Sequence, residues 1–327
     1  MPEAAVLYKE LRVNVVVPAF NEEALILGVL NGMPDFIDQI IVIDDCSTDD
    51  TNELVTEALA KDSRIRLLTH SKNLGLGQTL IDGYLASLET DAEITVVMAG
   101  DDQMDPNDLP GMLDTLINGK YDYVKGNRLL HANVSSMPRY RYLGNSLLTL
   151  LTKFATGYYA LMDPQCGYTA IRNNALAKIP IEKMTQGYGY NADILTMLNI
   201  QQFAVADCEV RPVYGEEKSN IKVWSYIPKI VVLLTKLFIR RLWWRHVILD
   251  FHPLIFFYAF GVSVLAFVNV PLAIRFGYIF VRVGEVPRTT AILFAVSIMA
   301  AIQSLLFAVW MDMEYGSRRR EFQGLRD

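Results

Sequence analysis

The chain is poor in cysteine and has no overall positive charge. It holds three cysteines in 327 residues, Cys46, Cys166 and Cys208, and their wide spacing excludes a zinc site or a disulfide framework built from paired cysteines. We expect reduced thiols in a domain that faces the cytosol. A net charge of −6 excludes a chain-wide basic surface for nucleic acid, so we expect no nucleic-acid partner.

The sequence also lacks the common glycine-rich phosphate cradles. Neither G-x-x-x-x-G-K-[ST] nor G-x-G-x-x-G follows the first apolar segment, which excludes the usual NTPase and dinucleotide sites. The four histidines have no paired spacing, and we do not expect them to bind metal. The first twelve residues carry neither a basic region nor an apolar core, so we expect no signal peptide.

Two long segments are free of charge, from Leu254 to Ile274 and from Thr289 to Met311. Each is long enough to cross a hydrocarbon core of about 30 Å as a helix. Two such segments in tandem favour transmembrane helices over buried helices of a soluble protein. Lys and Arg are more numerous outside the pair than between the segments, which predicts a multi-pass membrane protein with both termini and the catalytic domain in the cytoplasm.

The segment before these spans is apolar and basic at once. Trp243 and Trp244 stand beside Arg240, Arg241 and Arg245, a mixture typical of a helix in the lipid headgroup region. We therefore predict a cytoplasmic domain over residues 1–225, interfacial amphipathic helices over 226–250, two transmembrane helices over 251–311 and a basic cytoplasmic tail over 312–327.

The first two-thirds of the chain alternate between strand and helix patterns. Short β-branched runs, RVNVVVPAF, QIIVIDDCS, RIRLLTH and EITVVMAG, are apolar throughout, which is typical of strands buried on both faces. Helical patterns lie between them, at Thr51 to Ala60 and at Gln78 to Leu88. The alternation predicts an α/β domain with a doubly wound, mostly parallel sheet.

Acidic residues gather where these strands end. The stretch VVMAGDDQMDPN brings Asp101, Asp102 and Asp105 to the end of a strand, and Asp44 and Asp45 end another. Ligands of such sheets bind beyond the carboxyl ends of the strands. Carboxylates there suit a divalent cation that holds a phosphorylated ligand, and the alternative is an acidic turn of purely structural role.

The order and spacing of five motifs resemble the family-2 inverting glycosyltransferases, and among them the polyprenyl-phosphate sugar synthases with two C-terminal transmembrane helices. The motifs are VVVPAFNEE, IVIDDCSTDDT, NLGLGQTLIDGY, VMAGDDQMDP and DPQCGYTAIRN, and the resemblance spans roughly residues 13 to 225. It implies a Rossmann-like domain of the glycosyltransferase A type that binds a nucleotide sugar, either a UDP-hexose or a GDP-hexose.

The resemblance also implies roles for particular residues. The residues that correspond to the nucleotide-sugar site are Pro18, Phe20, Glu22, Ile43, Asp45, Gly75, Gly100 and Lys218, with Lys222 close to the last of these. Asp101 and Gln103 match the Mg²⁺ or Mn²⁺ ligands, and Asp101 is thereby a catalytic candidate. Ala99 stands where the family has a further aspartate, so Asp102 or water would complete the metal site.

The acceptor side is implied by the same resemblance. Arg128, Arg141 and Asn145 match ligands of an acceptor phosphate, for which the planar guanidinium is well suited. Asp163 and Asp193 match the region that supplies a general base in relatives with hydroxyl acceptors. A phosphate monoester is already anionic at neutral pH and needs no base, whereas a hydroxyl does.

We therefore expect metal-dependent, inverting transfer of a hexose from a nucleotide diphosphosugar to a polyprenyl, dolichyl-type phosphate at the cytoplasmic face of a cell or ER-type membrane. One alternative is the same donor chemistry onto a hydroxyl of a lipid-linked glycan or glycerolipid. The other is a catalytically silent membrane protein that binds a nucleotide sugar. The sequence leaves open the sugar, the nucleotide and whether the chain forms a homo-oligomer.

Overall fold

The computed structural model describes residues 7–128, 139–187, 189–211, 223–285 and 287–323. The chain forms two compact units, Met1–Arg241 and Leu242–Asp327, and each is described by itself. The boundary between them falls inside the predicted interfacial segment 226–250.

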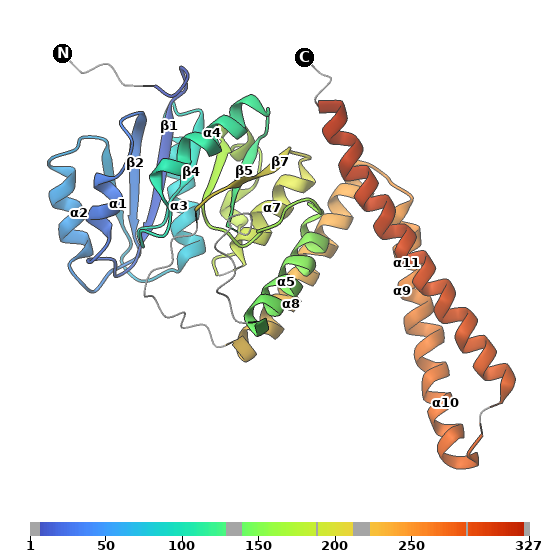
Figure 1. Ribbon diagram of the computed structural model, residues 1–327. Helices are drawn as coiled ribbons and strands as arrows, with labels where there is room; N and C mark the ends of the chain where they lie inside the picture. Colours follow the sequence, from blue (N-terminus) through green and yellow to red (C-terminus); the bar gives the residue numbers. More distant parts are fainter. Residues whose placement is uncertain (1–6, 129–138, 188, 212–222, 286, 324–327) are drawn as a thin grey trace. The chain divides into compact units, whose positions relative to one another are not determined.

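The first unit is built on a sheet of seven described strands in the order β3-β2-β1-β4-β6-β5-β7 (Figure 1). The strands are β1 (Val13–Ala19), β2 (Ile37–Asp44), β3 (Ile65–Thr69), β4 (Ile94–Val97), β5 (Tyr123–Asn127), β6 (Thr169–Arg172) and β7 (Val205–Glu209). β6 runs antiparallel to β4 and β5, and the other pairs are parallel. The predicted doubly wound, mostly parallel sheet is confirmed, and its four predicted strands are β1 to β4.

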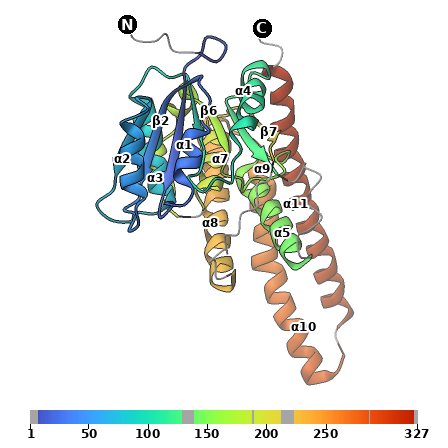
Figure 2. The ribbon, with the colours of Figure 1, turned by 60° about the vertical axis from the view of Figure 1, so that its left-hand side comes forward.

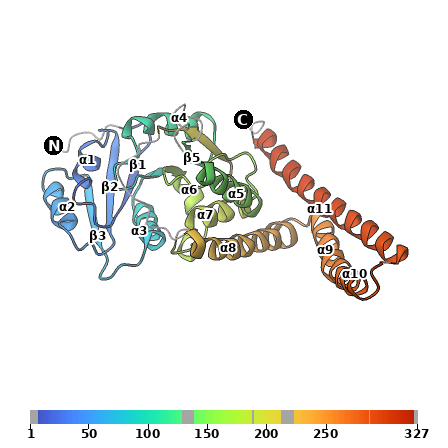
Figure 3. The same cartoon turned by 60° about the horizontal axis from the view of Figure 1, so that its bottom comes forward.

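Helices cover both faces of this sheet, as alternating strands and helices require. They are α1 (Ile26–Asn31), α2 (Thr51–Leu59), α3 (Leu76–Leu88), α4 (Leu109–Asn118), α5 (Arg139–Thr156), α6 (Asn173–Leu176), α7 (Tyr190–Ile200) and α8 (Val223–Trp243), with short 3-10 turns η1 (Pro106–Asp108) and η3 (Ile181–Lys183). Figure 3 shows α4 along one side of the sheet and α3 along the other.

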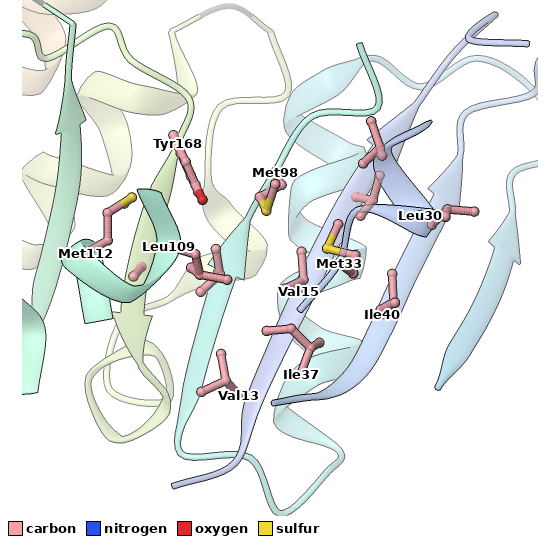
Figure 4. Packing of buried hydrophobic residues seen from close by; sticks show 14 of the residues in the cluster. Val13, Val15, Leu30, Met33, Ile37, Ile40, Met98, Leu109, Met112 and Tyr168 are labelled. Atoms are coloured by element: carbon pink, nitrogen blue, oxygen red, sulfur yellow. The ribbon is translucent and has the colours of Figure 1, made fainter. Parts of the chain in front are cut away.

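Two apolar cores follow from this layering. β1 is buried along its whole length, and alternate side chains point to opposite faces. Val13 and Val15 pack with Ile40 and with side chains of α1 and α4, among them Leu30 and Met112 (Figure 4). Side chains on the opposite face of β1 and β2 pack against α3, α6 and α7. The strands are apolar throughout because both of their faces are covered.

The helices α5 and α8 lie side by side at one end of the first unit (Figure 2). Ala155 of α5 packs with Ile230, Leu234 and Leu237 of α8, one turn apart along that helix. The outer faces keep exposed apolar side chains, which are Leu147, Leu150, Ile227, Val231, Val232 and Ile239. The α8 residues of this set lie in the segment 226–250, for which the sequence predicts a position in the headgroup region, whereas α5 lies outside that segment.

The second unit is a helical hairpin. It begins with a π-helical turn, η4 (Trp244–Leu249), and continues through α9 (Leu254–Val264), η5 (Leu265–Asn269), α10 (Val270–Val283) and α11 (Arg288–Gln323). Two helical spans, Leu254–Val283 and Arg288–Gly316, are long and apolar enough to cross a membrane. Gly261 lets the helices approach closely, because a Cβ there would lie 2.7 Å from Leu305.

Candidate functional site

The candidate site lies at the carboxyl ends of β1, β2 and β4. β1 pairs with β2 on one side and with β4 on the other, so the order of strands reverses between β1 and β4, where ligands of open α/β sheets bind. Pro18 is buried in β1 opposite Ile43 of β2, and its carbonyl accepts a hydrogen bond from the Gly100 amide at 3.1 Å. Three predicted donor-site residues are thus joined by backbone pairing.

The loop after β1 interlocks with the loop after β2. Asn21 adopts a left-handed conformation, φ 58°, and its Oδ1 accepts a hydrogen bond from the Thr48 amide at 2.8 Å. The Glu22 amide donates to the Thr51 hydroxyl at 2.8 Å, and the Phe20 ring is 44% exposed. The two loops therefore hold Phe20 and Glu22 at the strand ends, where the sequence predicts nucleotide contacts.

Asp45 joins the end of β2 to the loop before α3. Its carboxylate is buried and accepts hydrogen bonds from the amides of Leu74 and Gly75, both at 2.8 Å. Gly75 has φ 86°, a conformation that favours glycine, and precedes the first residue of α3. The Asp45 carboxylate therefore fixes the glycine loop that begins α3.

Sequence reasoning missed His70 in this region. Its Nδ1 lies 2.7 Å from Oδ1 of Asp45, and its Nε2 lies 3.0 Å from Oδ2 of Asp82 on α3. Spacing along the chain gave no sign of this, because the three residues meet only when the ends of β2 and β3 and one face of α3 come together.

The acidic loop after β4 holds the predicted metal ligands. The backbone amide of Gln103 donates a hydrogen bond to Oδ1 of the half-buried Asp101 at 3.2 Å, which holds the Asp101 side chain against this loop. Asp102 is exposed, with φ 54°. Asp105 forms an ion pair with Arg211 at 3.2 Å and accepts a hydrogen bond from the Asn107 amide, which favours the acidic-turn interpretation for this one residue.

These residues could hold a cation whose remaining coordination positions are filled by the substrate and water. Among the described residues, no group of three or more His, Cys, Asp or Glu side chains could enclose a metal ion. Mg²⁺ commonly takes one or two protein carboxylates and fills its remaining positions with substrate phosphates and water. One carboxylate, from Asp101, together with the side-chain amide that Gln103 offers two residues later in the same loop, fits that arrangement.

A second part of the site lies where β5 ends and β6 begins. Because β6 is antiparallel, the loop before it reaches the same edge of the sheet as the end of β4. Arg128 donates from Nε and Nη2 to the two oxygens of the buried Asp163, at 2.9 and 3.3 Å. The Tyr168 hydroxyl donates to the carbonyl of Asp105 at 3.3 Å, so this loop touches the acidic loop. The predicted acceptor arginine and the predicted metal loop therefore lie at the same edge of the sheet.

A buried lysine supports this second part, and sequence reasoning missed it also. Lys125 on β5 is fully buried, and its Nζ donates to the carbonyl of Cys166 and to Oδ1 of Asn191, the latter at 2.7 Å. Burial lowers the pKa of Lys125 from 10.5 to about 8. Burial also raises the pKa of the Cys166 thiol, which disfavours the thiolate form.

Asp193 has a different environment from Asp163. It lies on α7, is 2% exposed, and its Oδ2 accepts hydrogen bonds from the amide and hydroxyl of Thr185, at 2.8 and 2.6 Å. Its Oδ1 is paired with Arg240 of α8. Asp193 therefore ties α7 to α8 and to the segment before α7.

Four predicted residues lie outside what the structure describes. Arg141 and Asn145 belong to α5, but the placement of their side chains is not described, and Lys218 and Lys222 lie in the undescribed segment 212–222. Their roles stay predictions.

Comparison with known proteins matches residues 14–179 to the family model described as glycosyl transferase family 2. A UDP-N-acetylglucosamine–dolichyl-phosphate N-acetylglucosaminyltransferase of Methanococcus voltae is 26% identical over 218 residues, which are 62% of this chain and 86% of the relative. An undecaprenyl-phosphate mannosyltransferase of Micrococcus luteus is 27% identical over 188 residues, 56% of this chain and 76% of the relative.

Solved structures show the same fold. Glucosyl-3-phosphoglycerate synthase from Mycobacterium tuberculosis, in complex with Mn²⁺, UDP and phosphoglyceric acid, matches with a TM-score of 0.53 and 21% identity over 71% of this chain and 79% of that one. Its complex with Mg²⁺ and UDP matches with a TM-score of 0.51 and 20% identity over 71% and 80%. This likeness confirms the glycosyltransferase A-type architecture.

The family match covers just over half of the chain, and the reversal of strand order between β1 and β4, with an acidic loop beside it, agrees with that match. The chain therefore belongs to glycosyl transferase family 2 and is a glycosyltransferase.

Proposed function

We propose that this glycosyltransferase moves a hexose from a nucleotide diphosphosugar to a polyprenyl phosphate, with inversion, at the cytoplasmic face of a membrane. The observation that carries the proposal is the pairing of Arg128 with Asp163 at the edge of the sheet where the acidic loop of β4 lies, in a chain that also holds two helices apolar enough to span a bilayer. The names of the two curated relatives, both polyprenyl-phosphate sugar transferases, support the acceptor class.

On the donor side, the protein has to bind the nucleotide and stabilise the departing diphosphate. Pro18 and Phe20, at the end of β1, and Asp45, directly after β2, are proposed to contact the nucleoside, with the Asp45 carboxylate at its base. Asp101 and Gln103 would hold Mg²⁺ or Mn²⁺, which when bound neutralises charge on the diphosphate as the bond to the sugar breaks. Lys218 is proposed to add a positive charge at the same place.

On the acceptor side, Arg128 is proposed to bind the lipid phosphate. Asp163 holds its guanidinium by two hydrogen bonds, which fixes the direction of the remaining N–H groups. A phosphate oxygen then attacks the anomeric carbon on the face opposite the diphosphate, the new C–O bond forms, and the nucleotide diphosphate leaves with the electron pair. Orientation of a lipid phosphate against a soluble donor supplies much of the rate in this scheme.

The hydroxyl-acceptor alternative requires a general base, for which the sequence offers Asp163 and Asp193. The first of these, Asp163, is paired with Arg128. In the structure both of its oxygens accept hydrogen bonds from Arg128, which supports a role in orienting the arginine. The membrane location rests on the two apolar helices and on the exposed apolar face of α5 and α8. We propose that the catalytic unit and both termini lie on the cytoplasmic side.

The test is a transfer assay with the full chain in detergent. Radiolabelled UDP-glucose, UDP-N-acetylglucosamine and GDP-mannose are each offered with a polyprenyl phosphate, with Mg²⁺ or Mn²⁺ and then with EDTA. We expect label in the organic phase only with metal, and its loss in Asp101→Ala. Glu182→Gln, a change of an exposed carboxylate, is the matched control and keeps activity. A parallel reaction offers a lipid-linked glycan in place of the polyprenyl phosphate, and label that enters only this hydroxyl acceptor would replace the proposal with the hydroxyl alternative.

A further inference from the structure

The imidazole of His70 lies between two carboxylates of the donor site. Nδ1 is 2.7 Å from Oδ1 of Asp45, and Nε2 is 3.0 Å from Oδ2 of Asp82. Asp45 follows β2, His70 follows β3, and Asp82 lies on the second turn of α3. The ring therefore connects three elements around the glycine loop that begins α3.

The direction of the hydrogen bond to Asp45 follows from its other partners. Oδ1 of Asp45 also accepts the Leu74 amide, and Oδ2 accepts the Gly75 amide, both at 2.8 Å. A carboxylate with these partners is an acceptor, so Nδ1 of His70 carries the proton and donates it. On the other side, Asp82 also accepts the Gln78 amide group at 3.1 Å, which holds its carboxylate toward the ring.

These hydrogen bonds occupy most of the acceptor positions of the Asp45 carboxylate. A carboxylate offers roughly four lone-pair positions, two on each oxygen. Among the residues that the structure describes, His70 and Leu74 take both positions of Oδ1, and Gly75 takes one of Oδ2. One position on Oδ2 is left for a ligand.

Nucleobases differ in how many donors they present to a carboxylate. The edge of uracil carries a single imide N–H between two carbonyl oxygens. Guanine carries a ring N–H and an adjacent amino group, and this pair needs two acceptor positions, as a free carboxylate would provide. A guanine at Asp45 would leave one buried donor without its acceptor, which costs affinity.

We propose that His70 is a specificity-determining residue that makes the donor site select uridine over guanosine nucleotides, because it occupies one oxygen of Asp45. The inference rests on the proposed function, since it places the nucleotide base at Asp45. It names the donor class that the proposed function leaves open.

The experiment measures nucleotide binding to the full chain in detergent by isothermal titration calorimetry, with UDP and GDP as probes, Mg²⁺ present and no lipid acceptor. For the wild-type chain we expect UDP to bind about tenfold to a hundredfold more tightly than GDP, because one hydrogen-bond donor of guanine would be left without an acceptor. His70→Leu removes the ring donors and frees a position on Oδ1. The ratio of the dissociation constant of GDP to that of UDP should then fall to about threefold or less, because guanine can donate to both oxygens of Asp45.

Two variants serve as matched controls. His70→Asn puts an amide N–H where Nδ1 lies and should keep the preference for UDP. Asp82→Ala removes the outer bond but leaves the bond from His70 to Asp45, and it should also keep the preference for UDP. A general folding defect would weaken both nucleotides and leave their ratio unchanged, so the ratio reports on selection.

Several outcomes overturn the inference. If the wild-type chain binds GDP as tightly as UDP or more tightly, the inference is wrong. The proposed transfer to a polyprenyl phosphate would still stand, because it is measured in a separate assay. An undiminished ratio in His70→Leu removes His70 from the selection of the base. Failure of both nucleotides to bind overturns this inference together with the donor part of the proposed function.

Discussion

At Asp193, a single substitution can distinguish a structural role from a catalytic one. Its Oδ2 accepts two hydrogen bonds from Thr185, and its Oδ1 is paired with Arg240, so both oxygens have partners inside the fold. Asp193→Asn keeps the shape but removes the charge, and its amide group cannot accept from all three donors. We expect this variant to lose stability rather than catalytic chemistry.

The magnitude follows from burial. Removing one partner of a buried ion pair costs about 3–5 kcal/mol. Asp193 is 2% exposed but the Arg240 side chain is 33% exposed, so water rehydrates part of the guanidinium and the lower end applies, about 3 kcal/mol. For a unit of this size, Met1–Arg241, that corresponds to a fall in melting temperature of roughly 6–12 °C.

The assay is thermal unfolding of the purified full chain in detergent, followed by transfer kinetics well below the melting temperature. Glu182→Gln changes an exposed carboxylate near Thr185 and should shift the melting temperature by about 1–2 °C at most. An unchanged melting temperature in Asp193→Asn, with kcat reduced about a hundredfold or more, would refute the reasoning and assign Asp193 as a general base.

Three further predictions follow from single side chains. Burial lowers the pKa of Lys125 to about 8, so the folded chain gives up this proton before the unfolded chain does, and the stability of the wild type relative to Lys125→Met should rise as the pH increases from 8 to 10; a flat difference in denaturant titrations contradicts this. Gly77→Ala places a Cβ 2.3 Å from the Thr185 carbonyl, which should cost about 1–3 kcal/mol in unfolding experiments and raise the KM for donor, whereas Gly28→Ala, with open space around it, should do neither. Arg128→Lys keeps the charge but loses the two-point bond to Asp163, so the KM for polyprenyl phosphate should rise about tenfold with donor affinity unchanged; an unchanged KM would remove Arg128 from the acceptor site.

The sequence alone determined the class of fold and the positions of several candidate donor-site residues at strand ends. Uninterrupted apolar strands with helical patterns between them leave few arrangements other than a doubly wound sheet, since both faces of such strands need cover. Pro18, Asp45 and Gly100 could be placed at strand ends because the end of a strand is a local feature of the chain. The two apolar helices were also predictable, since length and composition are local properties.

Only the tertiary structure decided which of these residues meet, and with what. β6 enters the sheet antiparallel, and this brings Asp163 to the same edge as Asp101. His70 and Lys125 carry no signal along the chain, because their environments come from elements distant in sequence that fold around them. Asp193 has its oxygens taken by Thr185 and Arg240 for the same reason. Local pattern specifies the elements, but hydrogen bonds and burial between distant segments specify what each polar group can still bind.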